Sequence, residues 1–286
     1  MEKSNKLKKI LSPIIFVLTF VLPVLIFYGI IKFFTSPKIE IKESKFGKKT
    51  FSVKLPGESL RVFDEDLLNP KENKDFILTS WFKFRKLPKD GEKVILITKY
   101  DATTAYKQGY ALAIEKNSST GFRGSVFWQD INNNGRWYTF GEIPLVPGTW
   151  FMFTVSFTSN KHLAFHYTYE LNNEVVTKLI GAYKVSALPA SKSSFRVGSL
   201  ITQLFDGRVG TISIINSSNT EKNLEDLIKA NFDSPQNIPS IYKDDEVIFW
   251  TVGGENDLSK NSLKVLKVGK SSKAKNKNDI EQDSEI

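Results

Sequence analysis

The sequence predicts an all-β domain of two stacked antiparallel sheets, preceded by one membrane-spanning helix. Short segments that alternate apolar and polar residues with a period of two predict the strands, and Gly, Pro and Asn separate these segments at regular intervals. An uncharged apolar run near the N-terminus predicts the membrane helix. With 286 residues and 41% hydrophobic content, the chain can form one sizeable sandwich with appendages.

The N-terminal apolar run carries no charge from Leu11 to Ile31, which approaches the ~20 residues that cross a bilayer as a helix. The run is longer than the apolar region of a signal peptide, and no A-x-A-like cleavage site follows it. We therefore expect an uncleaved signal anchor over 11–34, after a short basic cytoplasmic leader at 1–10. Lysines on the two sides of the run nearly balance, so the charge bias that sets the orientation is small. A cleaved signal peptide is the alternative. We expect the C-terminal domain to lie outside the cytoplasmic membrane.

The region from 46 to 268 is predicted to be the β-sandwich, joined to the anchor by a Lys-rich linker at 35–45. Several strands are apolar on both faces, as in central strands of stacked sheets. Residues near 219–232 are the segment that resembles a helix, and the polar tail at 269–286 is expected to be disordered. The main predicted strands are 75–84, 92–100, 109–115, 124–130, 136–142, 150–157, 162–171, 193–199 and 207–215.

The order of these segments carries a resemblance. The chain shows LPGESLRV, then DFILTSWFKFRKLPKDGEKVILITKYD, GYALAI, VPGTWFMFTVSF, LAFHYTYELNNEVV, SSFRVGS and LFDGRVGTISIIN, followed by a short helix. Over roughly residues 51–232 this pattern resembles the laminin-G-like, concanavalin A-like jelly-roll family. The resemblance implies two curved antiparallel sheets and a binding module for glycans or proteins, in some members with a calcium ion at the rim.

Two features depart from the family pattern. Gly210 stands where the F-x-G-x-[IV]-D pattern has an acidic residue, so any role of that carboxylate is missing. Residues 246–266 are similar to the family's leading segment yet stand near the C-terminal end. They are expected to add a strand at 246–252 that completes a sheet, to begin a lost second repeat, or to form a peripheral strand.

The stretch WQDINNNGRW at 128–137 supports two interpretations. Asp130, Asn132 and Asn134 fit the opening of a calcium loop, whereas the Asn134-Gly135 pair fits a β-hairpin turn. Position 12 of the calcium loop, which should be Glu, is Gly141, and strands replace the flanking helices. The hairpin is therefore preferred, with a weak calcium site on Asp130, Asn132 and Asn134 as the possible cofactor site.

Aromatic residues near this stretch are the candidate ligand-binding residues. Trp128, Trp137 and Tyr138 can stack on sugar rings, although large aromatics also fill sandwich cores. Phe127 and Trp128 are adjacent, as are Trp137 and Tyr138, so one member of each pair should face away from the core. We expect ligand binding on the concave sheet face or on the rim loops around 101–107, 117–123 and 130–136.

Other chemistries lack support. Absence of Cys excludes thiolate metal sites and a Cys nucleophile. His162 and His166 would lie ~13 Å apart on a strand, too far to share a metal ion. The run Asp64 to Asp66 does not place two carboxylates as a glycosidase needs, and no hydrolase motif is present. The net charge of +9 comes from dispersed lysines, so no nucleic-acid partner is expected.

We therefore expect a single-pass membrane protein that displays a non-catalytic recognition or adhesion module for glycan or protein ligands. A structural subunit of an envelope or surface assembly is the first alternative, and a glycan-active hydrolase is the second.

Overall fold

The computed structural model of the chain describes residues 50–53, 59–63, 66–101, 108–119, 121–129, 135–158, 160–172, 174–186, 188–198, 205–218, 224–238, 240, 242–243, 246–254 and 256–268. The predicted leader, anchor, linker and tail lie outside these residues. Among the residues that are described, no helix is both long and apolar enough to span a membrane.

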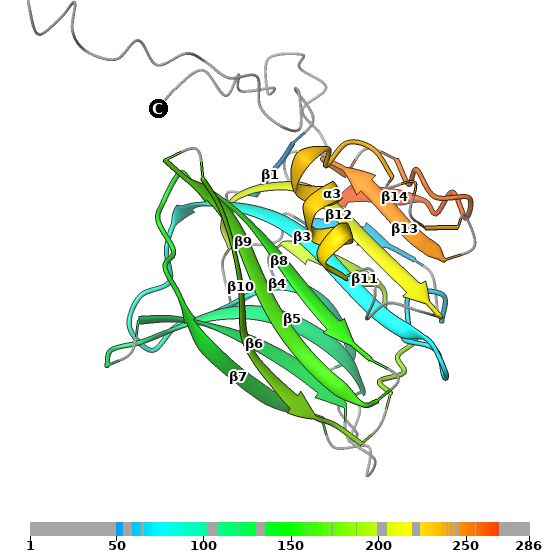
Figure 1. Cartoon of the computed structure of the whole chain (residues 1–286), viewed down its shortest axis with the longest axis horizontal. Coiled ribbons are helices and arrows are strands. Elements are labelled where there is room, and N and C mark those ends of the chain that lie inside the picture. The colour runs from blue at the N-terminus through cyan, green and yellow to red at the C-terminus, as the bar shows by residue number, and fades with distance from the viewer. Residues whose placement is uncertain are drawn as a thin grey trace, which may run out of the picture. The chain divides into compact units, whose positions relative to one another are not determined.

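The described strands form two stacked seven-stranded sheets, A and B (Figure 1). Every strand pairing within them is antiparallel, which confirms the predicted two-sheet sandwich. Sheet A has the spatial order β1 (Phe51–Val53), β12 (Asp206–Ser217), β3 (Asp75–Lys86), β8 (Trp150–Phe157), β9 (His162–Leu171) and β10 (Glu174–Lys184), with β13 (Val247–Val252) also paired to β12. Sheet B has the order β14 (Val265–Val268), β2 (Ser59–Val62), β11 (Phe195–Gly198), β4 (Lys93–Asp101), β5 (Gln108–Asn117), β6 (Gly121–Gln129) and β7 (Gly135–Ile143).

The layer between the sheets is rich in aromatic side chains. Strand alternation sends Phe76, Phe82 and Phe84 of β3 into this layer, where none of them is exposed to solvent. Edge-to-face and stacked ring pairs fill it, and Phe82 meets Phe205 with ring centroids 5.3 Å apart. Close packing of such large rings makes this layer the main source of stability.

The outer face of sheet A is covered in part by helix α3 (Leu224–Asp233). Leu227, Ile228 and Phe232 of the helix are buried, and the Phe232 ring lies 5.1 Å from Trp81 of β3. Figure 1 shows α3 lying along β12 and β13. This second apolar layer explains why β3 is apolar on both faces. The helix overlaps the segment near 219–232 that resembles a helix in the sequence.

The C-terminal segment adds one strand to each sheet. Strand β13 pairs with β12 in sheet A and lies where the sequence suggested an added strand, at 246–252. Strand β14, which the sequence patterns did not predict separately, pairs with β2 in sheet B. Between them the buried Asp257 carboxylate accepts hydrogen bonds from the backbone amides of Trp250 (3.0 Å), Ser259 (2.9 Å) and Leu263 (2.9 Å). It also accepts one from the Ser259 hydroxyl, at 2.8 Å.

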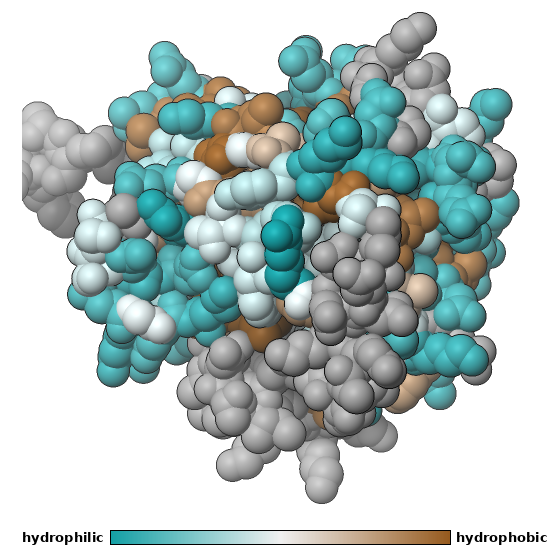
Figure 2. Space-filling view, turned by 90° about the horizontal axis from the view of Figure 1, so that it is seen from below, coloured by the Kyte–Doolittle hydropathy of each residue, from teal (hydrophilic) through white to brown (hydrophobic). Residues whose placement is uncertain are grey.

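Exposed large apolar side chains are scattered over the described surface. Three of them lie on the edge strand β10, namely Val175, Leu179 and Tyr183. On the face seen in Figure 2, hydrophobic residues lie in small groups between hydrophilic ones. Single exposed apolar residues of this kind are normal for a folded domain, so they mark no docking surface by themselves.

Replacing Asp257 should destabilise the sandwich. Asp257→Ala leaves three backbone amides, two of them buried, without an acceptor, and we expect the free energy of unfolding to fall by about 2–4 kcal/mol. Chemical denaturation of the full-length chain measures the change. Asp233→Ala, at an exposed position at the end of α3, is the control and should be nearly neutral. Equal losses in the two variants would contradict this role of Asp257.

The stability of the domain should depend on pH through His166. This side chain points outward from β9, and burial lowers the pKa of His166 from 6.5 to about 4. Between these pH values the unfolded chain binds a proton here and the folded chain does not, so stability falls as the pH drops. The loss attributable to His166 should reach about 3 kcal/mol near pH 4.

The variant His166→Gln should remove that component, which denaturation at pH 7 and at pH 4.5 can measure. The exposed His162→Gln variant is the control and should follow the parent. Parallel losses of stability in the parent and in His166→Gln would show that another group is responsible.

Candidate functional site

Only one of the three aromatic residues predicted to bind ligand lies on an outward face. Trp128 is fully buried between the sheets and stacks on Phe157 with centroids 5.1 Å apart. Tyr138 is 6% exposed and belongs to the same core. Strand alternation therefore places their neighbours, Phe127 and Trp137, on the outer face of sheet B. In this arrangement Trp128 and Tyr138 act as core residues, and Trp137 alone remains a candidate ligand contact.

The predicted calcium residues Asp130, Asn132 and Asn134 lie outside the described residues. On either side of them, β6 and β7 pair antiparallel with Gln129 opposite Gly135, as a hairpin requires. A Cβ atom on Gly135 would lie 1.9 Å from Cζ of Phe127, so the close approach to this ring requires glycine. Within the described part of the chain, no three His, Asp or Glu side chains come together as a metal site.

A row of alternating charges crosses the outer face of sheet B. Lys93 of β4 lies opposite Glu115 of β5, which lies opposite Arg123 of β6, and Arg123 lies opposite Glu142 of β7. Opposite charges on neighbouring strands attract, so this order favours the observed register. Arg123 Nε is buried and has no hydrogen-bond partner among the described residues.

Lys93 is the centre of the polar contacts on this face. Its Nζ atom lies 2.9 Å from Glu115 Oε2 and donates a hydrogen bond of 3.2 Å to the Ser125 hydroxyl. The Thr139 hydroxyl donates to the other Glu115 oxygen at 2.9 Å. Nζ also lies 4.1 Å from the centroid of the Trp137 ring, a cation–π contact. The charged and aromatic groups are thus held in fixed positions before any ligand binds.

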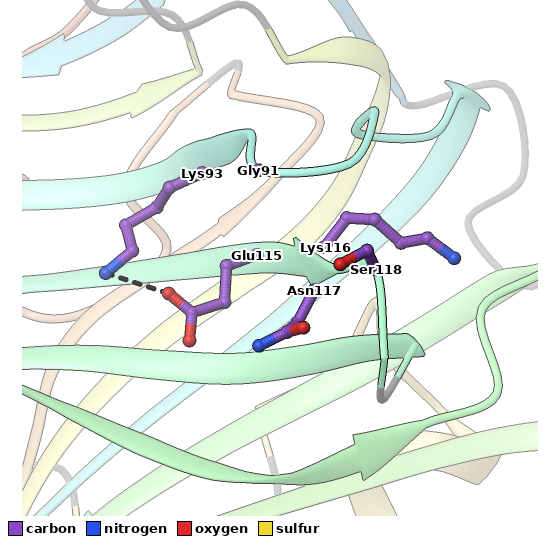
Figure 3. A pocket seen from close by; sticks show the side chains of 6 residues that line it. All are labelled: Gly91, Lys93, Glu115, Lys116, Asn117 and Ser118. Atoms are coloured by element: carbon purple, nitrogen blue, oxygen red, sulfur yellow. Dashed lines mark ion pairs between the residues drawn. The ribbon is translucent and has the colours of Figure 1, made fainter.

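A pocket of about 360 Å³ opens beside this cluster (Figure 3). Figure 3 shows the Lys93 and Glu115 side chains pointing toward one another, while Lys116 points away from them. Asn117, the last residue of β5, and Ser118, in the turn after it, line the pocket, and both belong to the segment 117–123 predicted to bind ligand. The volume lies in the range of small-molecule pockets, and the lining is polar.

Aromatic rings border the charged row on the same face. Phe127 is buried, with Tyr100 on one side at 4.4 Å and Trp137 on the other at 5.6 Å between ring centroids. Tyr100 and Trp137 are partly exposed. The outer face of sheet B therefore presents aromatic rings beside fixed hydrogen-bonding groups.

No protein-family profile matches this sequence, and no curated protein matches it significantly. In structure the chain is similar to full-length tailspike protein 2 of the Escherichia coli O157:H7 bacteriophage CAB120, with a TM-score of 0.46 and 11% identity, covering 71% of this chain and 28% of that one. The binding domain of botulinum neurotoxin serotype D gives a TM-score of 0.45 and 12% identity, covering 67% of this chain and 45% of that one. Peanut lectin with a 9mer peptide gives a TM-score of 0.33 and 15% identity over 56% of this chain and 81% of that one.

The chain thus spans less than half the length of the tailspike protein and of the neurotoxin domain. With TM-scores below 0.5 and such low identities, these similarities transfer no ligand or activity to this chain. What the chain binds has to follow from its own residues.

The sequence patterns did not single out Lys93, Glu115 or Arg123. Each lies near an end of a predicted strand, where a charged residue is ordinary. Their alignment depends on two bulges, one between Ile95 and Ile97 and one between Arg123 and Ser125, which shift the register. These residues could have been found from the sequence as charges at outward positions of adjacent strands. That search requires the register of each strand pair, which the sequence does not show.

The Lys93–Glu115 pair should contribute modestly to stability. Both side chains are about a fifth to a quarter exposed, at 24% and 21%, so solvent screens the attraction. A double-mutant cycle with Lys93→Met and Glu115→Gln should give a coupling energy of about 1 kcal/mol in the free energy of unfolding. Additive effects of the two substitutions would show that the pair does not hold together in solution.

Proposed function

We propose that the chain is a membrane-anchored glycan-recognition module that binds sugar on the outer face of sheet B and catalyses no reaction. The observation that carries the proposal is the partly exposed Trp137 beside the fixed Lys93, Glu115 and Thr139 groups. Sugar binding needs an aromatic surface for C–H groups and nearby polar groups for hydroxyls, and both are present here.

The membrane attachment rests on the apolar run at 11–34, and the domain would face the outside of the cytoplasmic membrane. Accessibility of the domain to added protease in intact cells, compared with permeabilised cells, tests this orientation. The non-catalytic assignment rests on the lack of a recognisable catalytic motif in the sequence.

A glycan array with the purified full-length chain tests the function. Saturable binding to a defined set of glycans supports recognition. Absence of binding together with protein partners that co-purify would favour the structural-subunit alternative, and released sugar products would favour the hydrolase.

The Trp137 ring should be needed for affinity. Trp137→Ala removes the stacking surface, so the Kd for an array-positive glycan should rise roughly two- to tenfold, by calorimetric titration. Trp150→Ala is a matched control, because Trp150 is a partly exposed tryptophan on sheet A with Lys83 5.6 Å from its ring. Affinity lost equally in both variants would place the binding surface elsewhere.

A further inference from the structure

Two arginines lie directly opposite one another on the outer face of sheet B. Arg61 of β2 pairs in register with Arg196 of β11. Their chain neighbours Leu60 and Val197 are buried in the core between the sheets, so both arginines point outward. Like charges at directly opposed positions repel, and such a pair destabilises a sheet unless something compensates for it.

No negative charge in the described part of the chain compensates this pair. No described carboxylate forms an ion pair with either guanidinium, and Arg61 Nε is buried without a hydrogen-bond partner. Arg196 Nε donates only to the Ser194 hydroxyl, at 3.2 Å. Burial, and then the neighbouring Arg61, lower the pKa of Arg196. Among the described residues, the pair thus concentrates positive charge at a partly buried place, which favours an external anion.

The arginine pair belongs to the same row of residues as Trp137. From β11 the register continues through Thr98, Ala111 and Phe127 to Trp137 on β7. These three intermediate side chains are buried, so ligand contacts are expected at the two ends of the row. Four strand spacings of ~4.8 Å separate the ends by ~19 Å, a span that suits an extended chain rather than a single sugar.

We propose that the outer face of sheet B binds an acidic polysaccharide, with Arg61 and Arg196 holding its carboxylate or sulfate groups and Trp137 contacting its sugar rings. This inference rests on the proposed glycan-binding function and specifies the class of glycan. A guanidinium matches a planar or tetrahedral oxyanion with two parallel hydrogen bonds, which a single sugar hydroxyl cannot accept. Phe63, the residue after β2, is exposed, and its ring centroid lies 5.5 Å from the Arg61 guanidinium. Its ring would add an apolar contact with the polysaccharide at this end of the row.

The test uses the full-length chain and four polymers: polygalacturonate, its methyl ester, dextran sulfate and single-stranded DNA. Polygalacturonate or dextran sulfate should bind, and the two polymers distinguish carboxylate from sulfate as the source of the anion. The methyl ester keeps the sugar chain and removes the charge, so it should bind much more weakly. Arg61→Gln and Arg196→Gln should each weaken binding of the acidic polymer roughly tenfold.

Two further variants separate a shaped site from general attraction. Lys178→Gln with Lys184→Gln removes two exposed charges from β10 in sheet A and should leave the affinity unchanged. Arg61→Lys with Arg196→Lys keeps the charge but loses the paired hydrogen bonds, so binding should weaken although less than with Gln. Because the Gln variants relieve repulsion, their Tm should not fall, which verifies that they fold.

The outcomes distinguish failure of the acidic-polysaccharide inference from failure of the proposed glycan recognition. Equal binding of polygalacturonate and its methyl ester, lost only in Trp137→Ala, would overturn the acidic class while supporting glycan recognition. Equal binding of single-stranded DNA, or equal loss in the Lys178/Lys184 control, would overturn it in favour of unspecific attraction to polyanions. Failure of all the polysaccharides, together with an empty glycan array, would overturn both.

Discussion

The central strands of this domain bury one face in the aromatic layer between sheets A and B. Rings such as Phe82, Phe153 and Trp128 are too large to be accommodated elsewhere, so their positions decide which residues face inward. Strand alternation then decides what faces outward, without any further choice. The positions of Trp137 and the arginine pair on the outer face of sheet B therefore follow from which of their chain neighbours pack into the core.

The two sheets use their outer faces differently. On sheet A, α3 and its neighbours form a second apolar layer over Trp81 and Met152. On sheet B the outer face carries Lys93, Glu115 and the two opposed arginines, groups that a covering helix could not bury without loss of hydration. The two outer faces therefore differ in chemistry: the face of sheet A is apolar where α3 packs on it, and the face of sheet B carries the charged groups on which the proposed recognition depends.

Much of this architecture could be predicted from the sequence, because alternation and turn residues are local signals. The strands around β3 to β9 were predicted in this way, whereas the strand at 246–252 was expected from the family resemblance, and the structure has strands at these places. Alternation also predicted that one member of each adjacent aromatic pair faces outward, but it could not say which one. Trp128 and Tyr138 face the core because the register of β6 and β7 sets their direction.

The candidate site was harder to predict for a physical reason. A bulge reverses the facing of all residues beyond it, and the bulge after Ile95 lies within the strand that carries Lys93. Arg61 and Arg196 are far apart in the sequence and meet only because β2 and β11 pair. No local pattern contains that pairing, so the charge concentration on sheet B becomes visible only in three dimensions.

The pairing of β14 with β2 also bears on how the domain forms. Val62 and Val265 are partners in sheet B, although almost the whole domain lies between them in the sequence. Contacts of this length give a high contact order, and closing so long a loop slows folding. Sheet B cannot be completed until β14 has left the ribosome, so during synthesis β2 has an unpaired edge. Until then, the domain would depend on chaperones or on its own slow collapse to keep that edge from pairing with other chains.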